Sequence, residues 1–184
     1  MKTWIKLASS IVTSLLLPTL MTSCGTTTSL KSTQGAELAV SARKFQKVIV
    51  KDFTTSVRST GVEVEIATST FPEHIAALIR RSGAFKTVTR DGPADEKTLV
   101  ISGVITRYTE GSAMMRYVVG MGAGSAYFDA TTQFSDSSGT SLGSIVTDKN
   151  SWGLGGAIAA TQTPQAFMSE AAQKIAAEAR KFAP

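Results

Sequence analysis

Hydrophobic residues alternate with polar ones, or form short runs of branched side chains, at several places between residues 45 and 150. Such segments are typical of β-strands, because successive side chains of a strand point to opposite faces of a sheet. We predict strands at residues 47–53, 85–90, 98–109, 125–134 and 141–149, and residues 62–66 alternate more weakly. Strands are therefore expected to make up most of the central part of the chain.

Two other segments have the period of an amphipathic helix. The first is expected between Thr70 and Gly83, because Thr70 and Glu73 fit a capping box and glycine commonly ends a helix. The second is expected to run to the C-terminus, with Thr163 as N-cap and Pro164 as its first residue. An apolar stripe of this kind is usually a helix face that packs on a core. In the second helix the stripe consists of Phe167, Ala171, Ile175, Ala179 and Phe182.

The resulting order of elements, β-α-β-β-β-β-α, predicts an α+β fold. Residues 136–140, DSSGT, are typical of a hairpin turn between two consecutive strands. We therefore expect two layers, a mostly antiparallel sheet of about five strands with two main helices packed on one face.

The first 23 residues have the parts of a secretory signal peptide. Lys2 and Lys6 precede an apolar stretch at residues 7–21, which is followed by small polar residues. The stretch is 15 residues long, whereas a membrane-spanning helix needs about 20 apolar residues. We therefore interpret it as a removable signal.

The only cysteine of the chain, Cys24, comes directly after this signal. The order resembles the bacterial lipobox, in which the thiol receives a lipid, the chain is cut before the cysteine and the new amine is acylated. That resemblance makes Met21, Thr22 and Ser23 the recognition residues, although Met21 stands where leucine is usual. Cys24 would then carry a diacylglycerol and an N-acyl chain such as palmitate, and several acyl chains anchor a protein stably. The alternative is an ordinary secreted protein with a chance cysteine.

The residues after Cys24 indicate where the domain is held. In the sorting rule of enteric-type bacteria, aspartate after the cysteine favours the inner membrane, so Gly25 implies the outer membrane and its periplasmic face. Residues 25–35, GTTTSLKSTQG, lack a hydrophobic period, which indicates a flexible tether. We expect a signal peptide at 1–23, a lipidated N-terminus and tether at 24–44, and a single periplasmic domain at 45–184.

Charge and composition exclude several classes of function. The net charge of +5 falls to +3 when Lys2 and Lys6 leave with the signal, since 17 basic and 14 acidic residues remain. This mild balance does not suggest a nucleic-acid-binding protein. Most zinc sites use cysteine and histidine, and with Cys24 acylated, His74 is the only residue of these two types that remains. We expect no metal, and no cofactor apart from the covalent lipid.

Two motifs resemble sites of chemistry, but their context does not fit. Residues 139–143, GTSLG, match the G-x-S-x-G pattern of hydrolases, yet they lie between two predicted strands and the only histidine lies upstream. Residues 120–125, GMGAGS, lack the lysine of a phosphate-binding loop and precede a strand. We expect no catalytic residue, and an esterase at Ser141 is the enzymatic alternative.

Two uncharged, glycine-rich segments are the remaining candidates for a functional surface. Residues 117–126 and 152–160 either pack internally or form a smooth patch that touches lipid or another copy, because small residues let backbones approach closely. Arg116 precedes the first segment in an apolar setting, and we expect Asp129 or Asp136 as its carboxylate partner. The candidate interaction or structural residues are Arg116, Gly120, Gly122, Gly124, Trp152, Gly155 and Gly156.

The middle of the chain resembles a family of bacterial lipoproteins known as domain of unknown function 4410. The shared pattern is a strand with a glycine, a second glycine, an arginine, a G-x-G-x-G-type loop, a strand and a D-x-x-G turn. These positions are Gly103, Gly111, Arg116, Gly120, Gly122, Gly124, Asp136 and Gly139. The resemblance covers roughly residues 45–180 and implies no activity, because the family has none assigned.

Together these observations favour a non-catalytic outer-membrane lipoprotein whose periplasmic domain binds another cell-envelope component. The alternative is a self-assembling envelope or secretion-type lipoprotein that oligomerises, or touches the membrane, through its glycine-rich segments. The expected partners are the membrane, through the lipid, and an envelope protein or a second copy, but neither nucleic acid nor a small-molecule cofactor.

Overall fold

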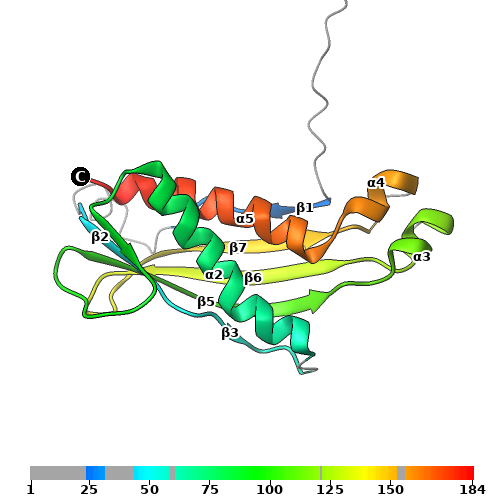
Figure 1. Cartoon of the computed structure of the whole chain (residues 1–184), viewed down its shortest axis with the longest axis horizontal. Coiled ribbons are helices and arrows are strands. Elements are labelled where there is room, and N and C mark those ends of the chain that lie inside the picture. Colours follow the sequence, from blue (N-terminus) through cyan, green and yellow to red (C-terminus); the bar gives the residue numbers. More distant parts are fainter. Residues whose placement is uncertain (1–23, 32–43, 59–60, 121, 153–155) are drawn as a thin grey trace, which may run out of the picture.

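The computed structural model describes residues 24–31, 44–58, 61–120, 122–152 and 156–184. Figure 1 shows α2 and α5 over one face of a long sheet, with α3 and α4 beyond one end of it. None of the described helices is long and apolar enough to cross a membrane. The elements are β1 (Cys24–Thr27), β2 (Lys47–Val50), β3 (Thr54–Thr55), α2 (Val62–Ser82), β4 (Thr87–Thr89), β5 (Thr98–Thr109), α3 (Ala113–Val118), β6 (Tyr127–Ser135), β7 (Ser141–Asn150), α4 (Gly156–Thr161), α5 (Pro164–Ala179) and the 3-10 turn η1 (Arg180–Phe182).

Within the described residues the sheet has seven strands in the order β1-β7-β6-β5-β2-β4, with β3 paired to β5. The pairs β1–β7, β7–β6 and β6–β5 are antiparallel. In contrast, β2 is parallel to both β4 and β5, and β3 is parallel to β5. The parallel pairing of β2 with β4 follows from α2, which carries the chain back along the sheet between them, because parallel strands need such a crossover.

The predicted fold class is therefore wrong. We expected two layers, with a mostly antiparallel sheet of about five strands and two main helices, whereas the described residues form a seven-stranded mixed sheet with four α-helices. The strands β1 and β3, CGTT and TT, are too short and polar to show a hydrophobic alternation. The helices α3 and α4 are six residues each and lie in segments whose glycines favour loops.

Helix α2 begins two turns earlier than the sequence predicted. Its N-cap is Gly61, and Thr70 lies inside the helix, where its hydroxyl donates a hydrogen bond of 2.9 Å to the carbonyl of Ile66. The weak alternation at 62–66 belongs to the first turns of this helix, with Val64 buried and Ile66 exposed. The helix ends at Gly83, in the left-handed conformation, as predicted.

Pro72 lies in the interior of α2 and links the helix to the chain after β2. Proline has no amide proton, so the carbonyl of Thr68 has no helical donor four residues later. That carbonyl instead accepts the amide of Phe53 at 2.9 Å. The ring of Phe53 then packs edge-on against that of Phe71, with centroids 5.2 Å apart.

The hydrophobic core lies between the sheet and the helices α2 and α5. The predicted N-cap Thr163 accepts the amide of Ala166 at 3.2 Å, and the whole predicted stripe of α5 and η1 is buried. A register shift between Ile105 and Arg107 changes the parity of β5, so Tyr108 faces the helices and Arg107 does not. This shift places a tyrosine hydroxyl at the edge of the helical layer.

Candidate functional site

Large apolar side chains are exposed mainly at one end of the domain. The last residue of β5, the first of β6 and the last of β7 are paired there, and α3 and α4 lie beyond them (Figure 1). Of the ten large hydrophobic residues exposed in the described part of the chain, seven belong to α3, α4 or the residues beside them. We call these seven the apolar end: Met114, Met115, Tyr117, Val118, Val119, Trp152 and Ile158.

Arg116 holds the segments of the apolar end together. Its side chain is buried, and its Nε donates to the carbonyl of Ala159 in α4 at 2.9 Å. Its Nη1 donates to the carbonyls of Glu110, at 3.0 Å, and Gly124, at 2.7 Å. Burial lowers the pKa of the Arg116 guanidinium, but an arginine remains charged in proteins. One cation therefore joins the end of β5, the glycine loop and α4.

The prediction that a carboxylate pairs with Arg116 is wrong, because the three hydrogen bonds of its guanidinium all go to backbone carbonyls. Asp129 lies on β6 opposite Arg107, and Asp136 accepts the amides of its own hairpin turn. The carbonyls of Ala159 and Gly124 also accept the amides of Gln162 and Ser112, and each oxygen uses its second lone pair for the guanidinium.

Three of the candidate glycines pack against other residues of the apolar end. A Cβ on Gly122 would lie 2.6 Å from the indole of Trp152, and one on Gly124 would lie 2.6 Å from the carbonyl oxygen of Ser112. Both glycines have positive φ, so a side chain would also strain the backbone. Gly120 is buried, and Gly122 and Gly124 are half-buried. Internal packing, one of the two predicted alternatives, therefore describes these three glycines.

Trp152 has one edge against Gly122 but remains 62% exposed. The two segments singled out in the sequence, 117–126 and 152–160, are thus brought together by this contact and by the bond from Arg116 to α4. Gly156 is the first residue of α4, and Gly155 lies outside the described residues.

Cys24 begins an edge strand that starts at the same end of the domain. In the antiparallel pair β1–β7, Cys24 is opposite Asn150, and the chain then runs away from the apolar end to Thr27, opposite Thr147. Further bonds join residues 28 and 31 to β7. Paired Cα atoms are about 5 Å apart and two extended residues span about 7 Å, so Cys24 lies on the order of 10 Å from Trp152. Residues 24–31 of the expected tether thus lie along the sheet.

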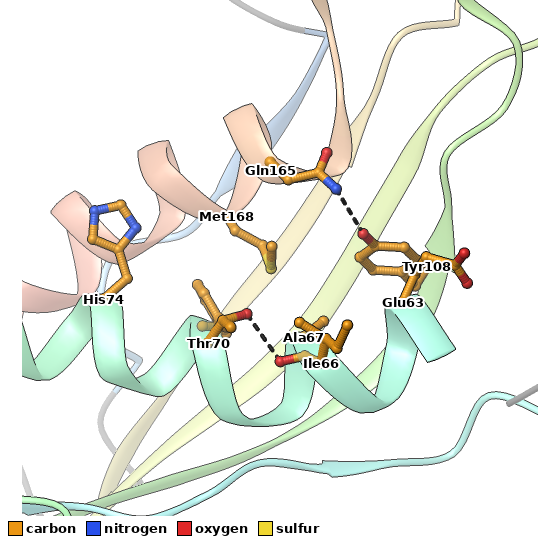
Figure 2. A pocket seen from close by; sticks show the side chains of 9 residues that line it. Glu63, Ile66, Ala67, Thr70, His74, Tyr108, Gln165 and Met168 are labelled. Atoms are coloured by element: carbon orange, nitrogen blue, oxygen red, sulfur yellow. Dashed lines mark hydrogen bonds between the residues drawn. The ribbon is translucent and has the colours of Figure 1, made fainter. Parts of the chain in front are cut away.

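A groove between α2 and α5 is the second candidate site (Figure 2). Its volume is about 480 Å³, and Ala67, Phe71 and Met168 give it a buried apolar floor. Sequence reasoning missed this groove because its two helices are about 100 residues apart in the chain. The lining residues are Glu63, Ile66, Ala67, Thr70, Phe71, His74, Tyr108, Gln165 and Met168.

Gln165 and Tyr108, at one end of the groove, belong to a hydrogen-bond network with Glu110. The Nε2 of Gln165 donates to the hydroxyl of Tyr108 and to Oε1 of Glu110, both at 3.0 Å. Burial, with the negative charge of Glu110, raises the pKa of Tyr108 to about 12. Figure 2 shows His74 at the other end of the groove, away from this network. The groove therefore presents apolar area, with the neutral phenol of Tyr108 and the carboxylate of Glu63 at its edge.

The motif that resembles a nucleophile elbow has a different context here. Ser141 is the first residue of β7, directly after the hairpin turn in which Asp136 Oδ1 accepts the amides of Ser138 and Thr140. The hydrolase motif places its serine between a strand and a helix. Across the described residues, no three His, Cys, Asp or Glu side chains are grouped to hold a metal ion.

Residues 43–155 match the family described as "Domain of unknown function (DUF4410)", which is more than half of the chain. The chain belongs to this family. The family predicted from the glycine pattern is thus confirmed, while the lipobox stays a prediction. A search of curated proteins found no match for this DUF4410 chain.

Solved structures with a similar fold include a PelC dodecamer from Paraburkholderia phytofirmans. The TM-score is 0.52 at 12% identity, with 85% of this chain and 97% of that chain covered. A point variant of that dodecamer gives a TM-score of 0.48 at 14% identity, covering 84% and 97%. At this identity the likeness to the first structure concerns the fold of the DUF4410 chain alone.

Proposed function

We propose that this DUF4410 chain is a non-catalytic outer-membrane lipoprotein, anchored through Cys24, whose periplasm-facing domain binds another component of the cell envelope. The observation that carries the proposal is the position of Cys24. The residue at which the signal pattern ends is also the first residue of strand β1. Acyl chains on this residue would hold the folded domain directly against a membrane, because no long linker separates them.

The groove between α2 and α5 supports the binding part of the proposal. Concave, mostly apolar surfaces with a few polar groups are the usual places where partners and ligands bind. Ile66 is 53% exposed at this groove, so a partner would cover apolar area that is now in contact with water. The groove lies on the helical face, whereas Cys24 lies on the edge strand next to β7 (Figure 1). An anchored domain would therefore keep the groove accessible.

A photo-crosslinking amino acid at Ile66 is expected to form a discrete adduct in intact cells. The matched control is the same amino acid at Val146, which is 43% exposed on β7 and does not line the groove. Immunoblots measure the adducts, and a band specific to position 66 supports binding at the groove. Absence of an adduct at 66, or the same band from both positions, would contradict it.

Self-assembly is the second candidate function, favoured by the likeness in fold to a protein that is described as a dodecamer. Glycine variants would not test it, because a side chain at Gly122 would collide with Trp152 and disturb the fold. The mass of the detergent-solubilised native protein tests it instead. Light scattering is expected to give several copies per particle if the chain self-assembles, and a mass of one chain would reject this candidate.

A further inference from the structure

We infer that the apolar end docks on the lipid bilayer, as a second and non-covalent membrane contact beside the lipid on Cys24. The inference rests on the proposed lipid anchor and adds an orientation to it. It assigns a role to exposed side chains of α3 and α4, not to the glycines that pack beneath them.

The first argument is the charge of the apolar end. Between Gly111 and Phe128 the only charged residue is Arg116, and between Ser151 and Ser169 there is none. Arg116 is buried and bonded to carbonyls, so it presents no charge to the surroundings. A bilayer strongly disfavours charged side chains, whereas an ordinary water-exposed surface carries many of them.

The second argument is the kind of side chain that is exposed. Tyr117 and Trp152 are 61% and 62% exposed, and these two residue types are enriched where membranes meet water. Met114 and Val118 are 76% and 67% exposed beside them. Large exposed apolar patches are uncommon on proteins that stay surrounded by water, and they mark places of contact with a protein or a membrane.

The third argument is the position of the anchor, which decides between a protein and a membrane. Cys24 is paired with Asn150, two residues before Trp152. The acyl chains would thus start on the order of 10 Å from Trp152, a fraction of the ~30 Å hydrocarbon core. When those chains insert, the apolar end is already at the membrane surface.

The fourth argument is that the apolar end is held as one unit. Helices of six residues are not stable alone, because the first turn costs more than it gains. Arg116 and the contact of Gly122 with Trp152 fix both short helices to the ends of the strands. The exposed side chains can therefore enter a bilayer together, without first being ordered.

Fluorescence of Trp152 tests this inference. The chain has two tryptophans, Trp4 and Trp152, and the proposed cut before Cys24 removes the first. The mature protein would be extracted from envelopes and reconstituted in vesicles of phosphatidylethanolamine and phosphatidylglycerol, with and without brominated acyl chains. We expect a blue-shifted emission that the brominated lipids quench.

Mass spectrometry first establishes whether Cys24 is acylated. If it is, and Trp152 still emits as in water and is not quenched by brominated lipids, the docking is overturned and the proposed function stays intact. An unmodified Cys24 would overturn the proposed function instead. In that case the purified protein is mixed with the same vesicles. Trp152 fluorescence that brominated lipids do not quench would then reject docking of the apolar end.

A pair of double variants separates docking from general hydrophobicity. Tyr117→Ser with Val118→Ser removes exposed area at the apolar end, and Val62→Ser with Val146→Ser removes exposed area on α2 and β7, at residues that belong neither to the apolar end nor to the lining of the groove. The ratio of docked to undocked protein is expected to fall about tenfold for the first pair only, because the bilayer would no longer cover two exposed apolar side chains. Equal quenching in both pairs would contradict the inference.

Discussion

Replacing Cys24 with serine is expected to remove the mature protein from the outer-membrane fraction. Serine offers no thiol for the lipid, so the acylated form cannot arise and the cut before residue 24 is not made. The strand β1 pairs with β7 through its backbone, so the change leaves the fold in place. Density-gradient fractionation of envelopes, with immunoblotting for precursor and mature forms, measures the result.

A matched control for this experiment is Thr26→Ser, another small substitution in β1. It keeps the cysteine and should mature and fractionate like the unaltered protein. A Cys24→Ser chain that is still cut and still sediments with the outer membrane would contradict the proposed anchor.

The second large effect is expected from Arg116→Met, which removes a buried guanidinium and its three hydrogen bonds to carbonyls. Breaking a buried, charge-assisted network of this kind costs about 3 kcal/mol of unfolding free energy. The loss should be concentrated at the apolar end, because the bonds join β5, the glycine loop and α4. Urea denaturation gives the total, and amide hydrogen exchange shows faster exchange in α3 and α4.

The matched control is Arg107→Met, the same substitution at an exposed position. Arg107 stacks over the ring of Tyr127 at 3.4 Å, and such a contact contributes about 0.5–1 kcal/mol at an exposed site. If both variants lose the same small amount of stability and α4 remains protected, Arg116 does not organise the apolar end.

Local sequence signals correctly predicted the helices and strands that neighbouring residues in the chain determine. The alternation of residues 98–109 gave the bounds of β5, and Thr163 with Pro164 gave the start of α5. The parallel pairing of β2 and the addition of β1 to the edge depend on contacts between distant residues. No pattern within Cys24–Thr27 indicates its pairing with β7, so the sheet was predicted too small. No local pattern indicates the direction in which β2 pairs, so the sheet was also predicted too antiparallel.

The sequence predicted several residues of the apolar end, but not the contacts that these residues make. The sequence indicated Arg116, Gly122 and Trp152, and the structure brings them together. It could not show that the guanidinium binds carbonyls, because the carbonyls within its reach depend on where the short elements begin and end. Nor could it show which apolar residues of α3 stay exposed, since the run MMRYVV in residues 114–119 has no helical period.

Lipid attachment at Cys24 is tested most directly by mass spectrometry of the N-terminal peptide of the protein purified from envelopes. We expect a peptide that begins at Cys24, with a diacylglycerol on Sγ and an acyl chain on the α-amine. A mature chain that begins at another residue, or one that carries a free thiol at Cys24, would contradict the membrane anchor.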